Sequence, residues 1–307
     1  MASLRARTLR WITSRYIQRV DTKSVEPTEL REKLNRVSRF LRKVRSVSVE
    51  ETTVNGLHAE WLRPRSAREG KVLLYLHGGA YVIGNCRTHR NLASHIAKAA
   101  RMTALLPEYR LAPEHRFPAA INDAVGVYRS LLADGVKPGD ITIAGDSAGG
   151  GLTVATLLSL RHAGIPMPAN AVLLSPFLDV TASGESMQTR ADQDPWFHRE
   201  DIAVASGHYC NDESEHRHPL VSPVFANVAG LPPTYIQVGN DEILLSDSTR
   251  FAEMLQEACV DVEIEIFPEM WHVFQLFVGK MPEARAAIKK IGKYLDGAPE
   301  EPAASEA

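Results

Sequence analysis

The stretch Ile141-Thr142-Ile143-Ala144-Gly145-Asp146-Ser147-Ala148-Gly149-Gly150-Gly151-Leu152 decides the fold. A β-branched apolar run enters a serine flanked by glycines, and a run of helix-forming residues follows, which is the context a G-x-S-x-G motif needs. Gly145 and Gly149 leave room for a bend so tight that a Cβ at either place would clash. The bend lifts the Ser147 hydroxyl above the strand ends, and the following helix points free N–H groups toward it. Ser147 is therefore the candidate nucleophile, with an ordinary glycine turn as the alternative.

Length and composition describe a globular protein. The chain has 307 residues, of which 44% are hydrophobic and 23% charged, so a single large α/β domain with insertions can bury its own core. A formal net charge of −2 gives no reason to expect nucleic acid as a partner. Because no apolar run approaches the roughly 20 residues that span a bilayer, we expect no stable membrane insertion.

The cysteines and the N-terminus bear on the compartment. Cys86, Cys210 and Cys259 are far apart and form no C-x-x-C pattern, so they predict free thiols in a reducing, cytoplasmic setting. Arginines interrupt the basic N-terminus, which excludes a secretory signal but leaves a transit peptide open. No nucleotide-binding glycine motif is present, and we expect no cofactor. One group of possible metal ligands is His208, Cys210, His216 and His218. We expect no metal there, because no partner carboxylate stands at a fixed spacing.

The order of apolar segments predicts an α/β fold with a mostly parallel sheet and helices on both faces. Alternating segments starting at 47–49 and at 57–62 predict antiparallel strands ahead of a central strand at 72–76. Further strands are expected at 103–107, 141–145, 171–175, 234–239 and 262–267. Helices are expected at 88–100, 118–133, 148–163, 246–258 and 282–295.

Two segments depart from this alternation and are expected to form a cap. Residues 1–45 carry two apolar stripes at helical spacing. The first runs through Leu9, Ile12, Tyr16 and Val20, and the second follows Pro27. Residues 180–225 are too long for a crossover and too apolar for disorder. The catalytic core is then expected at 46–179 and 226–296. The tail 297–307, rich in Glu, Ala and Pro, is expected to be disordered.

Later parts of the chain supply the partners that a serine nucleophile requires. Serine needs an imidazole to take its proton, and the imidazole needs a buried carboxylate to orient it. Asp241 follows the strand at 234–239, and His272 follows the last strand. The order serine, acid, histidine matches the topology of α/β hydrolases. Asp241 is favoured as the acid because it lies nearest the strand end; two alternatives are Asp247 and Glu242.

A second glycine loop directly follows the central strand. In His77-Gly78-Gly79-Ala80, the two glycines let their N–H groups turn toward a ligand. With the N–H of Ala148, the Gly78 and Gly79 amides would form a cradle for the oxyanion of a tetrahedral intermediate. His77 is predicted to be structural, its ring shaping the loop.

Together these motifs resemble the hormone-sensitive-lipase-like family of serine esterases, in its bacterial branch. The matching motifs run in the family's order over about residues 45–295: HGGA at 77–80, YRLAPE at 109–114, FPAA at 117–120, GDSAGG at 145–150, SP at 222–223 and LPP at 231–233. The resemblance implies an α/β-hydrolase fold with a helical cap, and a cofactor-free carboxylesterase for short acyl chains, often dimeric. It also implies the triad Ser147, Asp241 and His272. Four departures from the family pattern are Ala80, Asp241-Glu242-Ile243 in place of Asp-Pro-Leu, Glu269 and Arg116.

The substrate and the alternatives follow from this interpretation. Aromatic and bulky residues of the cap, Trp196, Phe197 and Tyr209, would close the acyl pocket. Asp146 and Tyr81 would border it. Deacetylation of a small N- or O-acetylated metabolite would use the same triad. A ligand-binding module, like the plant gibberellin receptors that lack the histidine, is disfavoured because His272 is present. Pairing of the last strand across a two-fold axis would make a homodimer.

Overall fold

The computed structural model describes residues 1–16, 25–38 and 44–297, and its centre is one eight-stranded sheet. The strand order is β1-β2-β4-β3-β5-β6-β7-β8. The strands span β1 Val47–Val54, β2 Leu57–Pro64, β3 Val72–Leu76, β4 Thr103–Pro107, β5 Ile141–Asp146, β6 Asn170–Leu174, β7 Thr234–Gly239 and β8 Val262–Phe267. All eight overlap the predicted strands.

The first strands are antiparallel and the rest are parallel. β2 pairs antiparallel with β1 and β4, whereas the pairs from β4 across to β8 are parallel. Every residue of β3 and β5 is buried, which explains their continuous apolar runs. Since parallel strands end at one edge of a sheet, the segments after β3, β5, β7 and β8 come together there.

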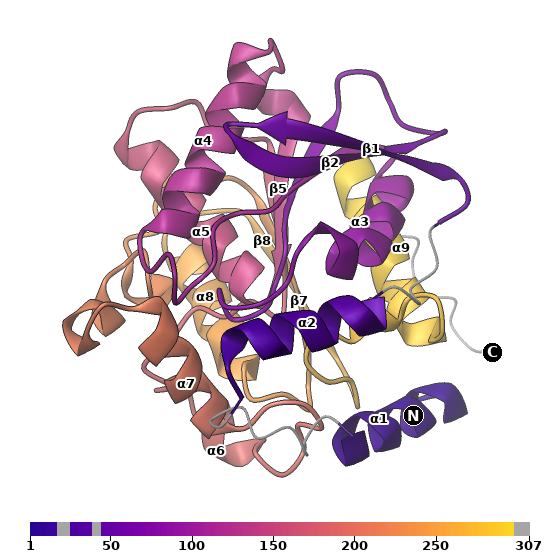
Figure 1. Ribbon diagram of the computed structural model, residues 1–307, viewed down its shortest axis with the longest axis vertical. Helices are drawn as coiled ribbons and strands as arrows, with labels where there is room; N and C mark the ends of the chain where they lie inside the picture. Colours follow the sequence, from indigo (N-terminus) through magenta and orange to yellow (C-terminus); the bar gives the residue numbers. More distant parts are fainter. Residues whose placement is uncertain (17–24, 39–43, 298–307) are drawn as a thin grey trace.

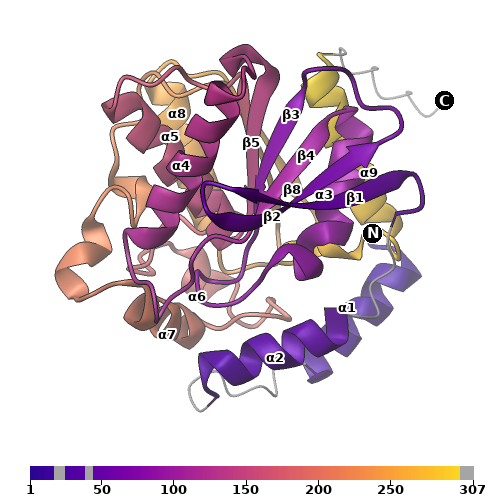
Figure 2. The same cartoon turned by 45° about the horizontal axis from the view of Figure 1, so that its top comes forward.

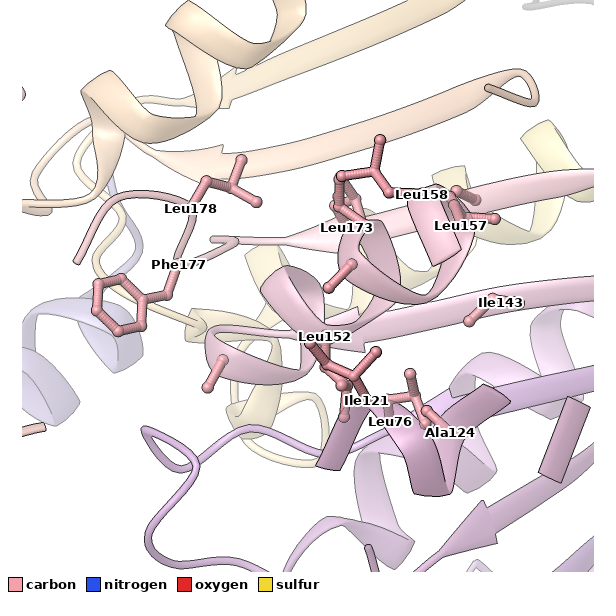
Figure 3. Close-up of a cluster of buried hydrophobic side chains, with 14 of the residues drawn as sticks. Leu76, Ile121, Ala124, Ile143, Leu152, Leu157, Leu158, Leu173, Phe177 and Leu178 are labelled. Atoms are coloured by element: carbon pink, nitrogen blue, oxygen red, sulfur yellow. The ribbon is translucent and has the colours of Figure 1, made fainter. Parts of the chain in front are cut away.

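Helices cover both faces of the sheet (Figure 1), and two apolar clusters lie beneath them. One face carries α4 (Ala119–Ala133), α5 (Ala148–His162) and α8 (Leu245–Glu257); the other carries α3 (Cys86–Ala100) and α9 (Pro282–Asp296). The residues of β3 alternate between the two clusters, with Leu74 in one and Leu73 in the other. Figure 3 shows Leu152 of α5 gathered with Leu76 and Ile121 in the first cluster. The mostly parallel α/β-hydrolase fold predicted from the sequence is confirmed.

The remaining helices come from the two segments expected to form a cap. They are α1 (Leu4–Tyr16), α2 (Pro27–Ser38), α6 (Ser186–Thr189) and α7 (Arg199–Tyr209), which lie together below the sheet in Figure 2. Short 3-10 turns complete the chain: η1 Pro138–Asp140, η2 Glu213–Arg217, η3 Pro223–Phe225 and η4 Phe274–Phe277. No helix in the described ranges is long and apolar enough to cross a membrane.

The predicted apolar stripe of α1 is only partly right. Leu9 packs against the core, but the Ile12 side chain is 40% exposed. The buried face instead contains Ala6 and Thr13, which are 0% and 3% exposed. Their small side chains let the helix approach the core closely, which a pattern of large apolar residues does not reveal. Val20 and the tail after 297 lie outside the described residues.

Candidate active site

Ser147 lies in the tight turn between β5 and α5. Its backbone has φ 52° and ψ −122°, a conformation that costs a non-glycine residue energy and persists only when its surroundings impose it. A Cβ on Gly145 would overlap the carbonyl oxygen of Gly149, and one on Gly149 would overlap that of Leu76. The predicted need for both glycines is confirmed.

Hydrogen bonds from the neighbouring strand hold this turn. The Ser147 N–H donates to the Leu174 carbonyl at the end of β6 (2.8 Å), and the Ser147 carbonyl accepts from the Phe177 N–H (2.9 Å). The strained backbone of Ser147 is therefore tied on both sides to the chain that leaves β6.

His272 pairs with Glu242, the residue after the predicted acid. Its Nδ1 lies 3.3 Å from Glu242 Oε1, and the two side chains are 4% and 0% exposed. The second oxygen, Oε2, accepts from the Ser175 hydroxyl and from the Gly239 N–H, both at 2.9 Å. An ionised carboxylate only accepts, so in this pair the imidazole proton lies on Nδ1 and leaves Nε2 able to take one.

The prediction that Asp241 holds His272 is wrong. The Asp241 carboxylate forms an ion pair with Arg10 of α1 and accepts from the Asn240 amide (3.0 Å). Its own N–H donates to the Met270 carbonyl (2.9 Å). In this turn consecutive side chains face opposite ways, so nearness to the strand end does not decide which acid faces inward.

A signal for Glu242 was present in the sequence. Glu242-Ile243-Leu244 is an acid, an apolar residue and a leucine, which is the family's Asp-Pro-Leu pattern shifted by one residue. Placing that motif one position later would have selected Glu242.

The other alternative acid, Asp247, is part of the core of the fold. It is 0% exposed, and its carboxylate accepts from the Leu178 and Asp179 N–H groups at 2.8 and 3.0 Å. Burial raises its pKa well above the ordinary value. Asp247 fixes the segment after β6 and does not meet the imidazole.

Ser175 was missed by the sequence analysis, although it connects Glu242 to the loop of His272. Its hydroxyl donates to Glu242 and accepts from the N–H of Val273 (3.1 Å), the residue after His272. Ser175 is fully buried, with φ 44°. Its position directly after a strand is the one sequence feature that points to it.

Asp194, also missed, connects segment 180–225 to the loop that carries Glu242. Its carboxylate accepts from the N–H groups of Trp196 (2.8 Å), Phe197 (3.1 Å) and Ile243 (3.0 Å). Burial raises the pKa of this carboxyl to about 6, against the opposing effect of His272.

Two predicted pocket residues follow Asp194 and lie at the imidazole. The Phe197 ring meets the His272 ring edge to face, with centroids 4.9 Å apart, and Trp196 stacks beside it at 6.0 Å. Phe277 closes on Trp196 at 6.2 Å. These three rings, Trp196, Phe197 and Phe277, form an aromatic wall beside His272, called the aromatic wall below.

The glycine loop offers fewer free donors than predicted. The Gly78 N–H donates to Asp146 Oδ1 (3.2 Å), so it is already engaged. The Gly79 N–H has no acceptor among the described residues, and Ala148 is the first residue of α5, where an N–H has no partner within the helix. Gly79 has φ 121°, which suits glycine, and a Cβ there would overlap the Ile83 carbonyl.

Asp146 is a buried brace, and its placement at the border of the pocket is wrong. Its carboxylate accepts from the Tyr75 hydroxyl (2.6 Å) as well as from Gly78, and lies 3.3 Å from His89 Nε2. Burial by itself raises the pKa of this carboxyl, but His89 and Tyr75 more than offset that and hold it below its ordinary value. Asp146 therefore stays ionised and fixes the glycine loop beneath Ser147.

The sequence and the fold of this chain match those of known proteins. Residues 73–276 match a family described as α/β hydrolase fold. An acetyl-hydrolase of Streptomyces hygroscopicus is 43% identical over 243 residues, 79% of this chain and 81% of that protein. An esterase of Acinetobacter venetianus is 35% identical over 271 residues, 88% and 89% of the two chains. A crystal structure of an esterase from the bacterial hormone-sensitive lipase family is 40% identical, covers 97% of this chain and 99% of that one, and has a TM-score of 0.91.

This chain belongs to the hormone-sensitive-lipase-like esterases. It is a carboxylic ester hydrolase of the α/β-hydrolase fold, as the motifs predict.

Two other motifs that carry the resemblance hold loops near the site of this esterase in place. Tyr109 of the YRLAPE motif stacks on His77 with centroids 4.3 Å apart and donates to the His77 carbonyl (2.6 Å). Burial lowers the pKa of His77 to about 3, so its ring is neutral and acts as packing. Ser222 of the SP motif accepts from the Val180 N–H (3.0 Å) and donates to the His216 carbonyl (2.6 Å).

Tyr81 and Tyr209, two further predicted pocket residues of the esterase, stack on each other. Their ring centroids are 3.8 Å apart at 7°, and the side chains are 2% and 1% exposed. The stack joins the glycine loop to α7 and is packing rather than an open pocket wall.

Elsewhere in the esterase, one group of possible metal ligands occurs within the described ranges, at His58, Glu60 and Cys86. Arg90 already pairs with Glu60 there, and burial raises the pKa of the Cys86 thiol. The three cysteines are free thiols.

Proposed function

We propose that this esterase hydrolyses esters of short acyl chains through a Ser147–His272–Glu242 triad and an acyl-enzyme. The observation that carries the proposal is the buried His272–Glu242 pair at the sheet edge where the Ser147 turn also lies. A serine hydroxyl is a weak nucleophile until a base accepts its proton, and a base oriented by a carboxylate does so most readily.

The reaction would proceed in two similar halves. Nε2 of His272 takes the hydroxyl proton as Ser147 Oγ bonds to the ester carbonyl carbon, and the Glu242 carboxylate stabilises the imidazolium. The imidazolium then gives that proton to the departing alcohol as the carbon–oxygen bond breaks. In the second half His272 activates water, which attacks the acyl-enzyme and releases the acid.

The N–H groups of Gly79 and Ala148 are the proposed oxyanion donors. Each points from a rigid element, one from the glycine loop held by Asp146 and one from the start of α5. Removing one such donor costs about 10²–10³ in rate in comparable enzymes. Gly78, predicted as a third donor, supports the loop instead.

Segments 1–45 and 180–225 are proposed to act as a cap on the core, residues 46–179 and 226–296. Segment 180–225 brings the aromatic wall against His272, which supports a preference for short acyl chains because long chains would need this wall to move.

A second activity, removal of an acetyl group from a small metabolite, has its own support. The relative that is 43% identical is named an acetyl-hydrolase, and acetyl is the shortest common acyl group. The same triad would serve both activities.

The quaternary state and the location stay predictions. Among the described residues β8 is an edge strand, paired only with β7, and Ile266 on it is 46% exposed. Both features support a homodimer through 262–267. A cytoplasmic location, and the lack of nucleic-acid partners or membrane insertion, rest on the sequence alone.

The test is hydrolysis of p-nitrophenyl esters from acetate to palmitate, with phenyl acetate compared against acetanilide for the acetyl activity. Rapid turnover confined to short chains, and lost in Ser147→Ala and Glu242→Gln, is the expected result. Undiminished turnover in those two folded variants would overturn the proposed triad, and a preference for long chains would overturn the proposed substrate class.

A further inference from the structure

The guanidinium of Arg10 meets three separate segments of the chain. From α1 its Nη1 pairs with the Asp241 carboxylate and lies 3.4 Å from the Glu269 carbonyl oxygen, while Nη2 donates to the Gln193 carbonyl (2.6 Å). These acceptors belong to the loop after β7, the loop after β8 and segment 180–225. A planar guanidinium can bridge several acceptors at fixed angles, which a lysine ammonium cannot.

Two of these acceptors lie next to the acid and the base. Asp241 immediately precedes Glu242, and Glu269 lies three residues before His272. The same two loops are also joined by the bond from the Asp241 N–H to the Met270 carbonyl. Arg10 therefore braces the pair of loops whose relative position sets the distance from Glu242 to His272.

The third acceptor lies next to the anchor of the aromatic wall. Gln193 immediately precedes Asp194, whose carboxylate holds the backbone of Trp196 and Phe197 and also the N–H of Ile243. Through Gln193, Arg10 reaches the segment that presents Phe197 to the imidazole.

The docking of α1 does not itself depend on Arg10. Ala6 is fully buried in the apolar cluster that contains Trp271. Ser3 donates twice to Glu283 of α9, from its N–H (2.6 Å) and its hydroxyl (3.0 Å). The helix thus has apolar and polar anchors of its own, and these place Arg10 beside the site.

The ion pair is withdrawn from solvent. The side chains of Arg10 and Asp241 are 30% and 12% exposed, so solvent and salt screen this pair less than they would an ion pair at the open surface.

We propose that Arg10 is a positioning residue of the active site. Resting on the proposed triad, this inference assigns Arg10 the task of holding the acid loop, the base loop and the aromatic wall in one arrangement, with Asp241 as its counter-ion. The N-terminal helix would thereby contribute to turnover without touching substrate.

The first test is kinetic, with p-nitrophenyl butyrate as the probe. Arg10→Ala and Asp241→Asn are expected to lower kcat/KM by about 3- to 30-fold each, and the double variant by no more than the larger single loss, because neighbours in one network are not additive. Arg7→Ala is the matched control, since Arg7 is an exposed arginine on the same helix, and it should leave kcat/KM unchanged.

The second test uses the acidic limb of the kcat/KM–pH profile, which reports the protonation of His272. Arg10→Ala leaves the Asp241 anion unpaired, which favours the imidazolium and moves the limb to higher pH. Asp241→Asn leaves the Arg10 cation unpaired and moves it lower; the double variant returns toward the parent profile. The other charged groups of the packed elements, Glu242, Asp194 and Glu269, are the same in all these proteins.

Opposite shifts of the acidic limb in Arg10→Ala and Asp241→Asn distinguish a positioning role from loss of structure. Loss of structure would lower activity in both variants without shifting their acidic limbs in opposite directions. Arg10→Lys keeps the charge and should keep the limb while losing the bridge to Gln193. Arg10→Ala matching Arg7→Ala in both measurements, or single losses that multiply in the double variant, would overturn the proposal. Ser147→Ala and Glu242→Gln, assayed alongside, report on the triad separately: if both remain active, the proposed function itself is overturned.

Discussion

Nδ1 of His272 faces Glu242 Oε1 at 3.3 Å, while the adjacent Asp241 faces α1. Two consecutive acids thus have different partners, one the buried His272 and the other Arg10 of the N-terminal helix. Only the buried one is placed to orient an imidazole.

Replacement of Glu242 tests this division. Glu242→Gln should lower kcat by about 10⁴-fold, because a neutral amide no longer stabilises the imidazolium or the required tautomer. Asp241→Asn should cost far less, and Glu242→Asp should fall between the two. Steady-state kinetics at pH 7.5 decide it; an equal or greater loss at Asp241 would contradict the assignment.

Ser175 offers a second prediction. Ser175→Ala removes the hydroxyl that bridges Glu242 and the Val273 N–H, leaving a buried donor unsatisfied at a cost of about 1–3 kcal/mol, and it should also lower kcat. Ser159→Ala removes a hydroxyl bond to the Ala155 carbonyl on α5 and serves as the control. Urea unfolding and kcat are measured together, and equal kcat in the two variants would refute a role for Ser175 in the site.

The raised pKa of Asp194, about 6 in the folded protein, predicts a pH-dependent stability. Between about pH 4 and pH 6 the folded state holds a proton that the unfolded state has lost, so this group's contribution to stability falls as pH rises, by at most about 1.4 kcal/mol per pH unit.

Asp194→Asn cannot titrate. The free energy of unfolding of the parent minus that of Asp194→Asn should therefore decrease from pH 4 to pH 6 and level off above that. Urea melts at several pH values measure this difference, and a constant value would show that Asp194 does not titrate in that range.

The nucleophile turn predicts intolerance of a single methyl group. Gly149→Ala places a Cβ on the Leu76 carbonyl, and we expect a loss of about 3 kcal/mol or more, at the upper end for overpacking, together with loss of activity. Gly207→Ala, with nothing within 4 Å of the added Cβ, should be neutral or slightly stabilising. Thermal unfolding compares the two, and a wild-type melting temperature for Gly149→Ala would disprove the tight approach.

Phe197 provides a test of the acyl pocket. Phe197→Ala removes the ring that meets His272 at 4.9 Å, so the chain-length optimum should move toward longer p-nitrophenyl esters. Phe225→Ala removes an aromatic ring of the same segment that Arg217 covers at 4.3 Å, and it serves as the control. An unchanged chain-length optimum in Phe197→Ala would show that this ring does not line the acyl pocket.

Much of the architecture could be predicted because its signals are local in the sequence. The buried strands read as continuous apolar runs, and the Ser147 turn carries its glycines at fixed offsets. His272 could be placed because it is the histidine that follows the last strand. Each of these inferences needs only neighbours along the chain.

The parts that could not be predicted depend on which way a side chain turns. Asp241 and Glu242 are adjacent, and only the rotation of the turn after β7 decides which is buried. Gly78 loses its N–H to Asp146, 68 residues away. Likewise, the hydrogen-bond partners of the Ser175 hydroxyl come from two later loops, so the residue type and its position in the sequence do not reveal them.

The position of the Asp146 carboxylate bears on when the geometry of the proposed active site forms. It belongs to the residue immediately before Ser147 and accepts from the Gly78 N–H, next to Gly79. One buried carboxylate therefore connects the proposed nucleophile to the loop of the proposed oxyanion donor. On the proposed mechanism, their mutual spacing is set when the chain folds, before substrate binds. Asp146, the residue between the first glycine and the serine of the G-x-S-x-G motif, thus fixes this geometry in advance. The N–H dipoles of the proposed oxyanion hole then need no rearrangement at the moment of reaction.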